Sequence, residues 1–110
     1  MIIKSTLRLT RSHVKRAIAE KAVTGHIADC CVLSQAVRDM FGVEASQVST
    51  CNGRTSVFEK NSYREIARVR YLNPEIIRLS QEDSQIWPLV KPTTVRVEIE
   101  LYTVDKQTTV

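Results

Sequence analysis

The stretch S-T-C-N-G-R-T-S, residues 49–56, decides how the middle of this chain folds. Its Asn52-Gly53 pair separates Glu44–Thr50 from Arg54–Phe58, and both flanking segments have the composition of strands. An Asn-Gly pair predicts a tight hairpin, because a type I′ turn needs a positive φ at both central positions. We therefore expect two antiparallel strands joined at Asn52-Gly53.

The same stretch also suits an anion-binding loop. In that interpretation Arg54, Thr55 and Ser56 would donate hydrogen bonds, and Gly53 would allow the anion to approach the backbone closely. The two interpretations are compatible, because binding residues often lie at the tips of hairpins.

Three further strands are predicted from the alternation of apolar and polar residues, which places every second side chain on one face. The first covers residues 3–9 and the last covers residues 95–101. Between them lies a strand at residues 67–71, in which Ala67, Val69 and Tyr71 alternate with Arg68 and Arg70.

Two helices are predicted between the first strand and the hairpin. One begins after Thr10 or Ser12, either of which can cap it, and ends at Gly25. The next covers about Ile27 to Phe41 and ends at Gly42. Their apolar stripes are Val14, Ala17, Ile18 and Ala22 in the first helix, and Cys30, Leu33, Ala36, Val37, Met40 and Phe41 in the second.

A third helix is expected to begin at Asn73-Pro74-Glu75 and to end before Trp87-Pro88. The resulting order of elements predicts an α+β fold, with a mostly antiparallel sheet of 4–5 strands and 2–3 helices on one face. We expect residues 1–104 to form this small single domain and residues 105–110 to form a flexible polar tail.

Composition narrows the functional classes. The 110 residues carry a net charge of +4, which permits an anionic partner without requiring one. The N-terminus lacks a signal-peptide pattern, and no apolar run is long enough to cross a membrane. The cysteines Cys30, Cys31 and Cys51 make no disulfide framework. We therefore expect a cytoplasmic protein that has reduced thiols and does not contact a membrane.

Neither a metal centre nor a catalytic centre is expected. A zinc site needs at least three protein ligands, and the neighbours His26, Cys30 and Cys31 would need His13 or Cys51 to complete the set. A cysteine nucleophile needs a base beside it, whereas the apolar stripe places Cys30 in the core. Nucleotide-binding glycine motifs are also missing. The sequence thus predicts a protein that is not an enzyme and carries no cofactor.

Arginines near hydroxyl and tyrosine side chains are the strongest candidates for a binding site. Arginine binds phosphate through two parallel hydrogen bonds, and tyrosine beside it on a sheet can stack a base. A helix start also attracts anions, although a simple cap is the alternative there. For every cluster, an ordinary solvated surface is the other interpretation. The candidate ligand-binding residues are Arg54, Thr55, Ser56, Tyr63, Arg68, Arg70 and Tyr71, with Arg11, Ser12 and His13 at the helix start.

Two segments, T-R-S-H-V-K-R-A at residues 10–17 and D-C-C-V-L-S-Q-A-V-R-D at residues 29–39, resemble a group of small, mostly uncharacterised phage and bacterial proteins. That group shares a Thr-x-x-His helix start, a Cys-x-x-x-x-Ala-x-Arg helix and a following strand. The likeness covers about the first half of the chain, and Val32 stands where the group often has proline. The resemblance implies a phage or mobile-element origin, where small proteins without enzyme motifs often inhibit host defence. It assigns no site residues.

The function predicted from these features is capture of an anionic, nucleotide-like ligand. In a phage context, such capture would antagonise host defence by sequestration in the host cytoplasm. The alternative is a nucleic-acid-binding module that uses the same charges over a larger face, with Arg11, Lys15 and Arg16 contacting phosphates.

A host protein is a third candidate partner, which needs no special residues. The apolar run around Ile86, Trp87, Leu89 and Val90 would serve such an interface or a homodimer, although for Trp87 we expect packing against the domain's own sheet. We also predict a homo-oligomer, because the long last strand is expected at an edge of the sheet.

Overall fold

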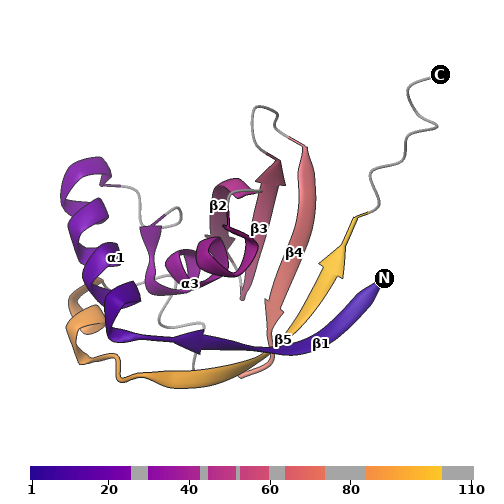
Figure 1. Ribbon diagram of the computed structural model, residues 1–110. Helices are drawn as coiled ribbons and strands as arrows, with labels where there is room; N and C mark the ends of the chain where they lie inside the picture. The colour runs from indigo at the N-terminus through magenta and orange to yellow at the C-terminus, as the bar shows by residue number, and fades with distance from the viewer. Residues whose placement is uncertain (26–29, 43–44, 52, 60–63, 74–83, 103–110) are drawn as a thin grey trace.

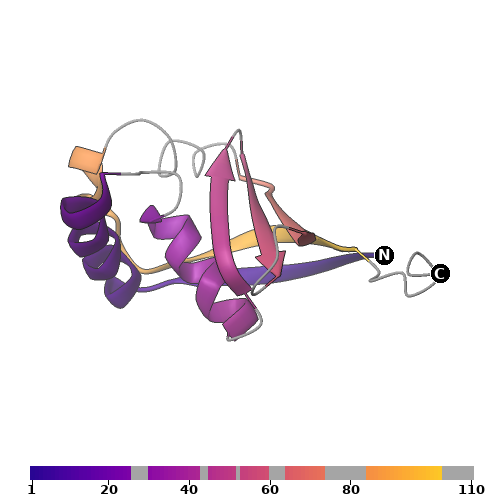
Figure 2. The same cartoon turned by 90° about the horizontal axis from the view of Figure 1, so that it is seen from above.

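The computed structural model describes residues 1–25, 30–42, 45–51, 53–59, 64–73 and 84–102, and the structural statements below concern these residues. Five strands form one antiparallel sheet in the order β1-β5-β4-β3-β2, and two helices lie on one side of it (Figures 1 and 2). This confirms the predicted α+β fold. The elements are β1 (Ile2–Leu9), α1 (Arg11–Thr24), α3 (Val32–Phe41), β2 (Ala45–Cys51), β3 (Arg54–Glu59), β4 (Glu65–Tyr71), the 3₁₀ helix η2 (Ser84–Leu89) and β5 (Thr93–Leu101).

The hairpin predicted from Asn52-Gly53 is confirmed. Strands β2 and β3 pair antiparallel, with Cys51 opposite Arg54, so that a two-residue connection joins them. Gly53 has a φ of 78°, a conformation that residues with a Cβ seldom adopt. The meander continues through β4 to β5, and β5 then pairs with β1.

Helix α1 begins as predicted after Thr10. The Thr10 hydroxyl accepts a hydrogen bond from the backbone N–H of His13, and the backbone N–H of Thr10 donates to Nδ1 of His13 at 3.0 Å. These reciprocal bonds form a capping box in which histidine takes the usual place of glutamate. The helix stops at Gly25, whose N–H donates to the carbonyl of Lys21.

The second helix differs from its prediction. Helix α3 begins at Val32 instead of Ile27, because Cys31 is its N-cap and has an extended backbone. Cys30 and Cys31 are both almost fully buried, whereas neighbours in one α-helix point about 100° apart around its axis. The break at Cys31 thus lets both thiols enter the core. Residues 26–29 lie outside the described part of the chain.

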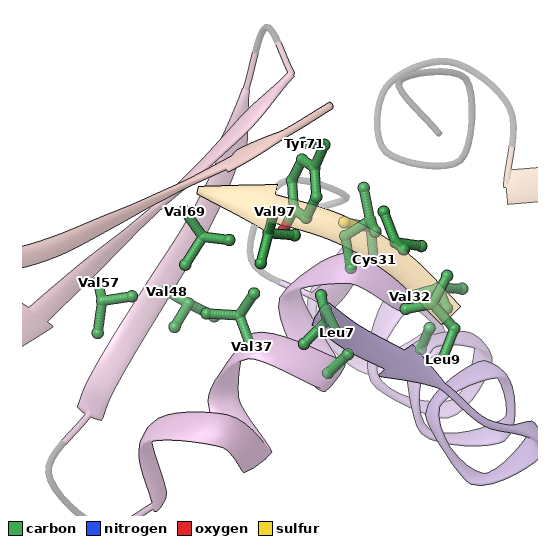
Figure 3. Close-up of a cluster of buried hydrophobic side chains, with 14 of the residues drawn as sticks. Leu7, Leu9, Cys31, Val32, Val37, Val48, Val57, Val69, Tyr71 and Val97 are labelled. Atoms are coloured by element: carbon green, nitrogen blue, oxygen red, sulfur yellow. The ribbon is translucent and has the colours of Figure 1, made fainter. Parts of the chain in front are cut away.

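The core lies between the sheet and α3, where valines of β2, β3, β4 and β5 meet Val32 and Val37 (Figure 3). Helix α1 contributes less than predicted: Val14 and Ala17 are buried, but Ile18 is 42% exposed. The reason is that α1 packs on α3 and η2 at the border of the sheet. Met40 is also 37% exposed, so the predicted stripe of the second helix is only partly buried.

The last strand does not lie at an edge, contrary to the prediction. Strand β5 pairs with β1 from Thr93 to Glu100 and with β4 from Val97 to Leu101, and the two edges of the sheet are β1 and β2. Trp87 lies in η2 and is 1% exposed, so its predicted burial is confirmed. The helix predicted at Asn73-Pro74-Glu75 and the predicted tail fall outside the described residues. No described helix has the length and apolar character needed to span a membrane.

Candidate anion-binding face

The face of the sheet that points away from the helices, called the outer face here, carries rows of charged side chains. Strand pairing places Lys4, Glu98, Arg70 and Arg54 side by side, because each residue is the registered partner of the next. Of these four, Lys4, Arg54 and Arg70 are exposed and Glu98 is half-buried. The neighbouring row runs from Ile2 through Glu100 and Arg68 to Ser56.

Arg54 and Arg70 form the most unusual pair on this face. The N–H of Tyr71 donates to the carbonyl of Gly53 at 3.1 Å, one residue beyond the Arg54–Arg70 pair on each strand. This places the two arginines at a non-hydrogen-bonded position, where side chains of antiparallel strands lie closest. Like charges directly opposite each other destabilise a sheet. Neither arginine forms an ion pair with any described carboxylate, so an anion between them would relieve the repulsion.

Arg68 is held in place by other residues. Its Nε and Nη2 donate to the two carboxylate oxygens of Glu65 at 3.1 and 3.0 Å, and its guanidinium lies 5.9 Å from the centre of the Tyr102 ring. Partial burial opposes ionisation of Glu65, but hydrogen bonds from Arg68 and Ser56, together with the positive charges of Arg68 and Arg54, lower the pKa of this carboxyl. The result is a fixed guanidinium plane beside an aromatic ring, next to the Arg54–Arg70 pair.

A small hollow opens on the outer face beside these residues. Its volume is about 110 Å³, and it is lined by Ile2, Arg68, Arg70, Glu98 and Glu100. Sites that enclose a whole ligand span about 300–1,000 Å³. The hollow therefore fits one part of a ligand, such as a sugar or a phosphate, while the remainder lies over the open sheet.

Two of the predicted ligand-binding residues are wrong. Thr55 and Tyr71 are 0% and 6% exposed and face the core, opposite the arginines, because adjacent residues of a strand point to opposite faces. The Tyr71 hydroxyl hydrogen-bonds to Thr55, and the chain of hydroxyls continues to Thr50 at 2.6 Å and then to Ser34 at 2.7 Å. Burial raises the pKa of Tyr71, which keeps the phenol protonated. Tyr63 lies outside the described residues.

The predicted helix-start site is a structural junction. Because Nδ1 of His13 accepts from Thr10, the ring carries its proton on Nε2, which donates to Oδ2 of Asp39 at 2.9 Å. Arg16 also binds Asp39, at 3.0 and 2.6 Å. The side chain of His13 is thus fully engaged, and the adjacent carboxylate would repel an anion. Arg11 and Ser12 are exposed on α1, away from the outer face of the sheet.

A second and wider hollow of about 440 Å³ lies at this junction between β1 and α3. It is lined by His13 and Asp39 together with Leu7, Arg8, Thr10, Ala36 and Met40. There the ring of His13 and the carboxylate of Asp39 already bind each other. On the outer face, Arg54 and Arg70 form no ion pair with a described carboxylate. The outer face is therefore the better candidate for binding an anion.

The described residues contain no group of three side chains that would hold a metal ion. Cys30 is buried, as predicted; Cys31 is buried as well, and Cys51 is exposed. His26, which was also considered as a zinc ligand, lies outside the described residues.

Sequence reasoning missed several residues of the outer face, namely Ile2, Glu98, Glu100 and Tyr102. The signal was present, because Arg96, Glu98 and Glu100 alternate with the buried Val95, Val97 and Ile99. What the sequence does not show is that β5 lies beside β4, which brings these carboxylates next to Arg68 and Arg70.

Comparisons of the chain with protein-family models, curated proteins and solved structures find no match. The resemblance to the phage and bacterial group therefore stays a prediction.

Proposed function

We propose that this chain is a non-enzymatic binding protein that captures an anionic, nucleotide-like ligand on the outer face of its sheet. The observation that carries the proposal is the Arg54–Arg70 pair, two like charges at the closest cross-strand position that form no ion pair with a described carboxylate. A phosphate group placed between two guanidinium groups accepts several charge-assisted hydrogen bonds at once.

The surroundings of the pair suit the rest of a nucleotide. Arg68 is fixed by Glu65 and lies over the ring of Tyr102, so a base has a planar cation and an aromatic ring nearby. Base stacking on aromatic and guanidinium groups contributes about 1–3 kcal/mol for each base. In this proposal Tyr102 takes the stacking role that was predicted for Tyr63 or Tyr71.

The proposal is tested by thermal unfolding of the protein with a panel of ribonucleoside mono-, di- and triphosphates. A ligand at about 100 times its Kd stabilises the folded state by about 2.7 kcal/mol, which raises Tm by on the order of 10 °C in a domain of this size. A nucleotide that raises Tm in the wild type, but not in an Arg70→Ala variant, supports capture at this face. If no member of the panel shifts Tm, the proposal is wrong.

A nucleic-acid-binding role is the second candidate, and one observation favours it. The basic residues extend past the hollow to Arg96, which is exposed and alternates with the buried Val95 and Val97. A single strand lying along this face would release counterions, so its affinity would fall steeply with salt. Titration of a single-stranded oligonucleotide at several salt concentrations decides this, since a flat response removes the candidate.

The homo-oligomer was predicted from an exposed edge at the last strand, but β5 lies between β1 and β4 in the sheet. Pairing of two copies therefore needs another edge. We propose that two copies pair through the free edge of β1. This edge carries Ile2 and Ile3, which are 62% and 39% exposed, and such exposed apolar edges tend to pair with another chain. Sequestration of a nucleotide signal against host defence would be the biological role in a phage context.

A further inference from the structure

We propose that the ligand is a ribonucleotide whose ribose hydroxyls are bound by Glu98, so that the outer face distinguishes ribose from deoxyribose. This inference rests on the proposed function and adds the class of sugar. Its starting point is a carboxylate beside a phosphate-binding pair. For a site that binds only phosphate, a neighbouring carboxylate is unfavourable, because it repels the ligand.

Glu98 has the right position for this role. It is the registered partner of Arg70 on the adjacent strand and lines the same hollow as Arg70. Its other neighbour in the row is Lys4, yet among the described residues Glu98 forms no ion pair with either cation. Both carboxylate oxygens are thus able to accept hydrogen bonds from a ligand.

Glu100 makes a matched comparison two residues further along the strand. It lies on the same face and lines the same hollow, but one of its oxygens already accepts a hydrogen bond from the Tyr102 hydroxyl at 3.3 Å. Its registered partner is Arg68, which is bound to Glu65. Glu98 is therefore the carboxylate beside Arg70, which forms no ion pair with a described carboxylate, and Glu100 belongs to the neighbouring network.

The chemistry separates ribose from its deoxy form. A carboxylate accepts hydrogen bonds from the 2′- and 3′-hydroxyls of ribose, as acidic residues do in dinucleotide-binding folds. A 2′-deoxy ligand lacks the 2′-hydroxyl and so loses one hydrogen bond to the carboxylate. Hydrogen bonds to charged groups are stronger than those between neutral groups. We expect the ribonucleotide to bind about tenfold more tightly than its 2′-deoxy counterpart.

The experiment measures Kd by calorimetry for each common ribonucleoside 5′-monophosphate, its 2′-deoxy counterpart and inorganic phosphate. It is repeated with Glu98→Gln and with Glu100→Gln as the matched control. Glu98→Gln removes the charged acceptor and the repulsion of phosphate together. The preference for ribose should therefore collapse to less than about threefold, while inorganic phosphate binds at least as well as before. Glu100→Gln should keep the preference.

Each outcome bears on a different level of the account. Equal affinities of ribose and deoxyribose ligands in the wild type overturn the inference and leave the proposed function standing. A ribose preference that survives Glu98→Gln overturns the assignment to Glu98. If no nucleotide binds the wild type, the proposed function fails and the inference fails with it.

Discussion

At the scale of single residues, the Arg54–Arg70 pair is unfavourable for the stability of the sheet. The pair places two positive charges at the closest cross-strand position of the sheet, on an exposed face. A fold selected for stability alone would have opposite charges there, since such pairs contribute about 0.2–1 kcal/mol. Unfavourable local choices of this kind are characteristic of binding sites.

The variant Arg54→Glu tests this conflict. We expect it to raise the free energy of unfolding by about 0.5 kcal/mol, because an opposite-charge pair replaces a like-charge pair and both side chains remain screened by solvent. It should also abolish the stabilisation by nucleotides. Urea unfolding with and without ligand measures both effects.

The matched control is Arg96→Glu on the same face, where the registered partner on β1 is the uncharged Thr6. This control should not gain stability. A loss of stability in Arg54→Glu would contradict the proposed repulsion.

At the scale of elements, polar contacts fasten α1 to α3. His13 and Arg16 of α1 hold Asp39 of α3, and Arg38 of α3 contacts Glu20 of α1 at 3.1 Å. These contacts supplement a small apolar interface, because α1 buries few of its apolar residues. Hydrogen bonds from Arg16, reinforced by His13, lower the pKa of Asp39 despite its partial burial.

The lowered pKa of Asp39 predicts acid sensitivity. A carboxyl with a lowered pKa adds stability above its pKa in the unfolded chain, and this stability is lost as pH falls through its pKa in the folded protein. Asp39→Asn should reduce the free energy of unfolding at pH 7 by about 0.5–1 kcal/mol, since the Asp39 side chain is 50% exposed.

Asp39→Asn should also lose less stability than the wild type below about pH 4. Unfolding at neutral and acid pH checks this difference. Parallel acid curves for the wild type and Asp39→Asn would contradict the expectation.

Elements with a strong local signal were predicted correctly from the sequence. The Asn52-Gly53 pair located the hairpin, and the alternation around Val95 and Val97 located β5. The position of β5 between β1 and β4 was predicted wrongly, because strand order depends on pairing between residues far apart in the chain. The prediction of Tyr71 as a ligand-binding residue was an avoidable error. Alternation along the strand already placed Tyr71 on the other face of the sheet from Arg70.

At the scale of the whole molecule, helices cover one face of the sheet, and no described helix covers the other. The proposed ligand site lies on this second face.

The edge of the sheet at β1 is where a second copy would pair. The N–H of Leu101 donates to the carbonyl of Met1, so Ile2 and Glu100 are a non-hydrogen-bonded pair. By alternation, the N–H groups of Lys4 and Thr6 point away from β5.

The variant Thr6→Pro tests pairing through β1. It removes an outward N–H without breaking a hydrogen bond to β5, which an edge strand tolerates. We expect the wild type to have twice the mass of the chain in native mass spectrometry, and Thr6→Pro to be a monomer with a cooperative thermal transition. The control Thr6→Ala keeps the N–H and should stay dimeric. A monomeric wild type, or a folded dimeric Thr6→Pro, would contradict pairing through this edge.

The most direct test of the central claim is a nuclear magnetic resonance titration of the labelled protein with each common ribonucleoside 5′-monophosphate. Resonances of the Arg54 and Arg70 side chains, and of the adjoining backbone in β3, β4 and β5, are expected to shift with a common Kd. Shifts confined to Thr10–His13 at the start of α1, or no saturable shifts with any of these nucleotides, would contradict ligand capture on the outer face.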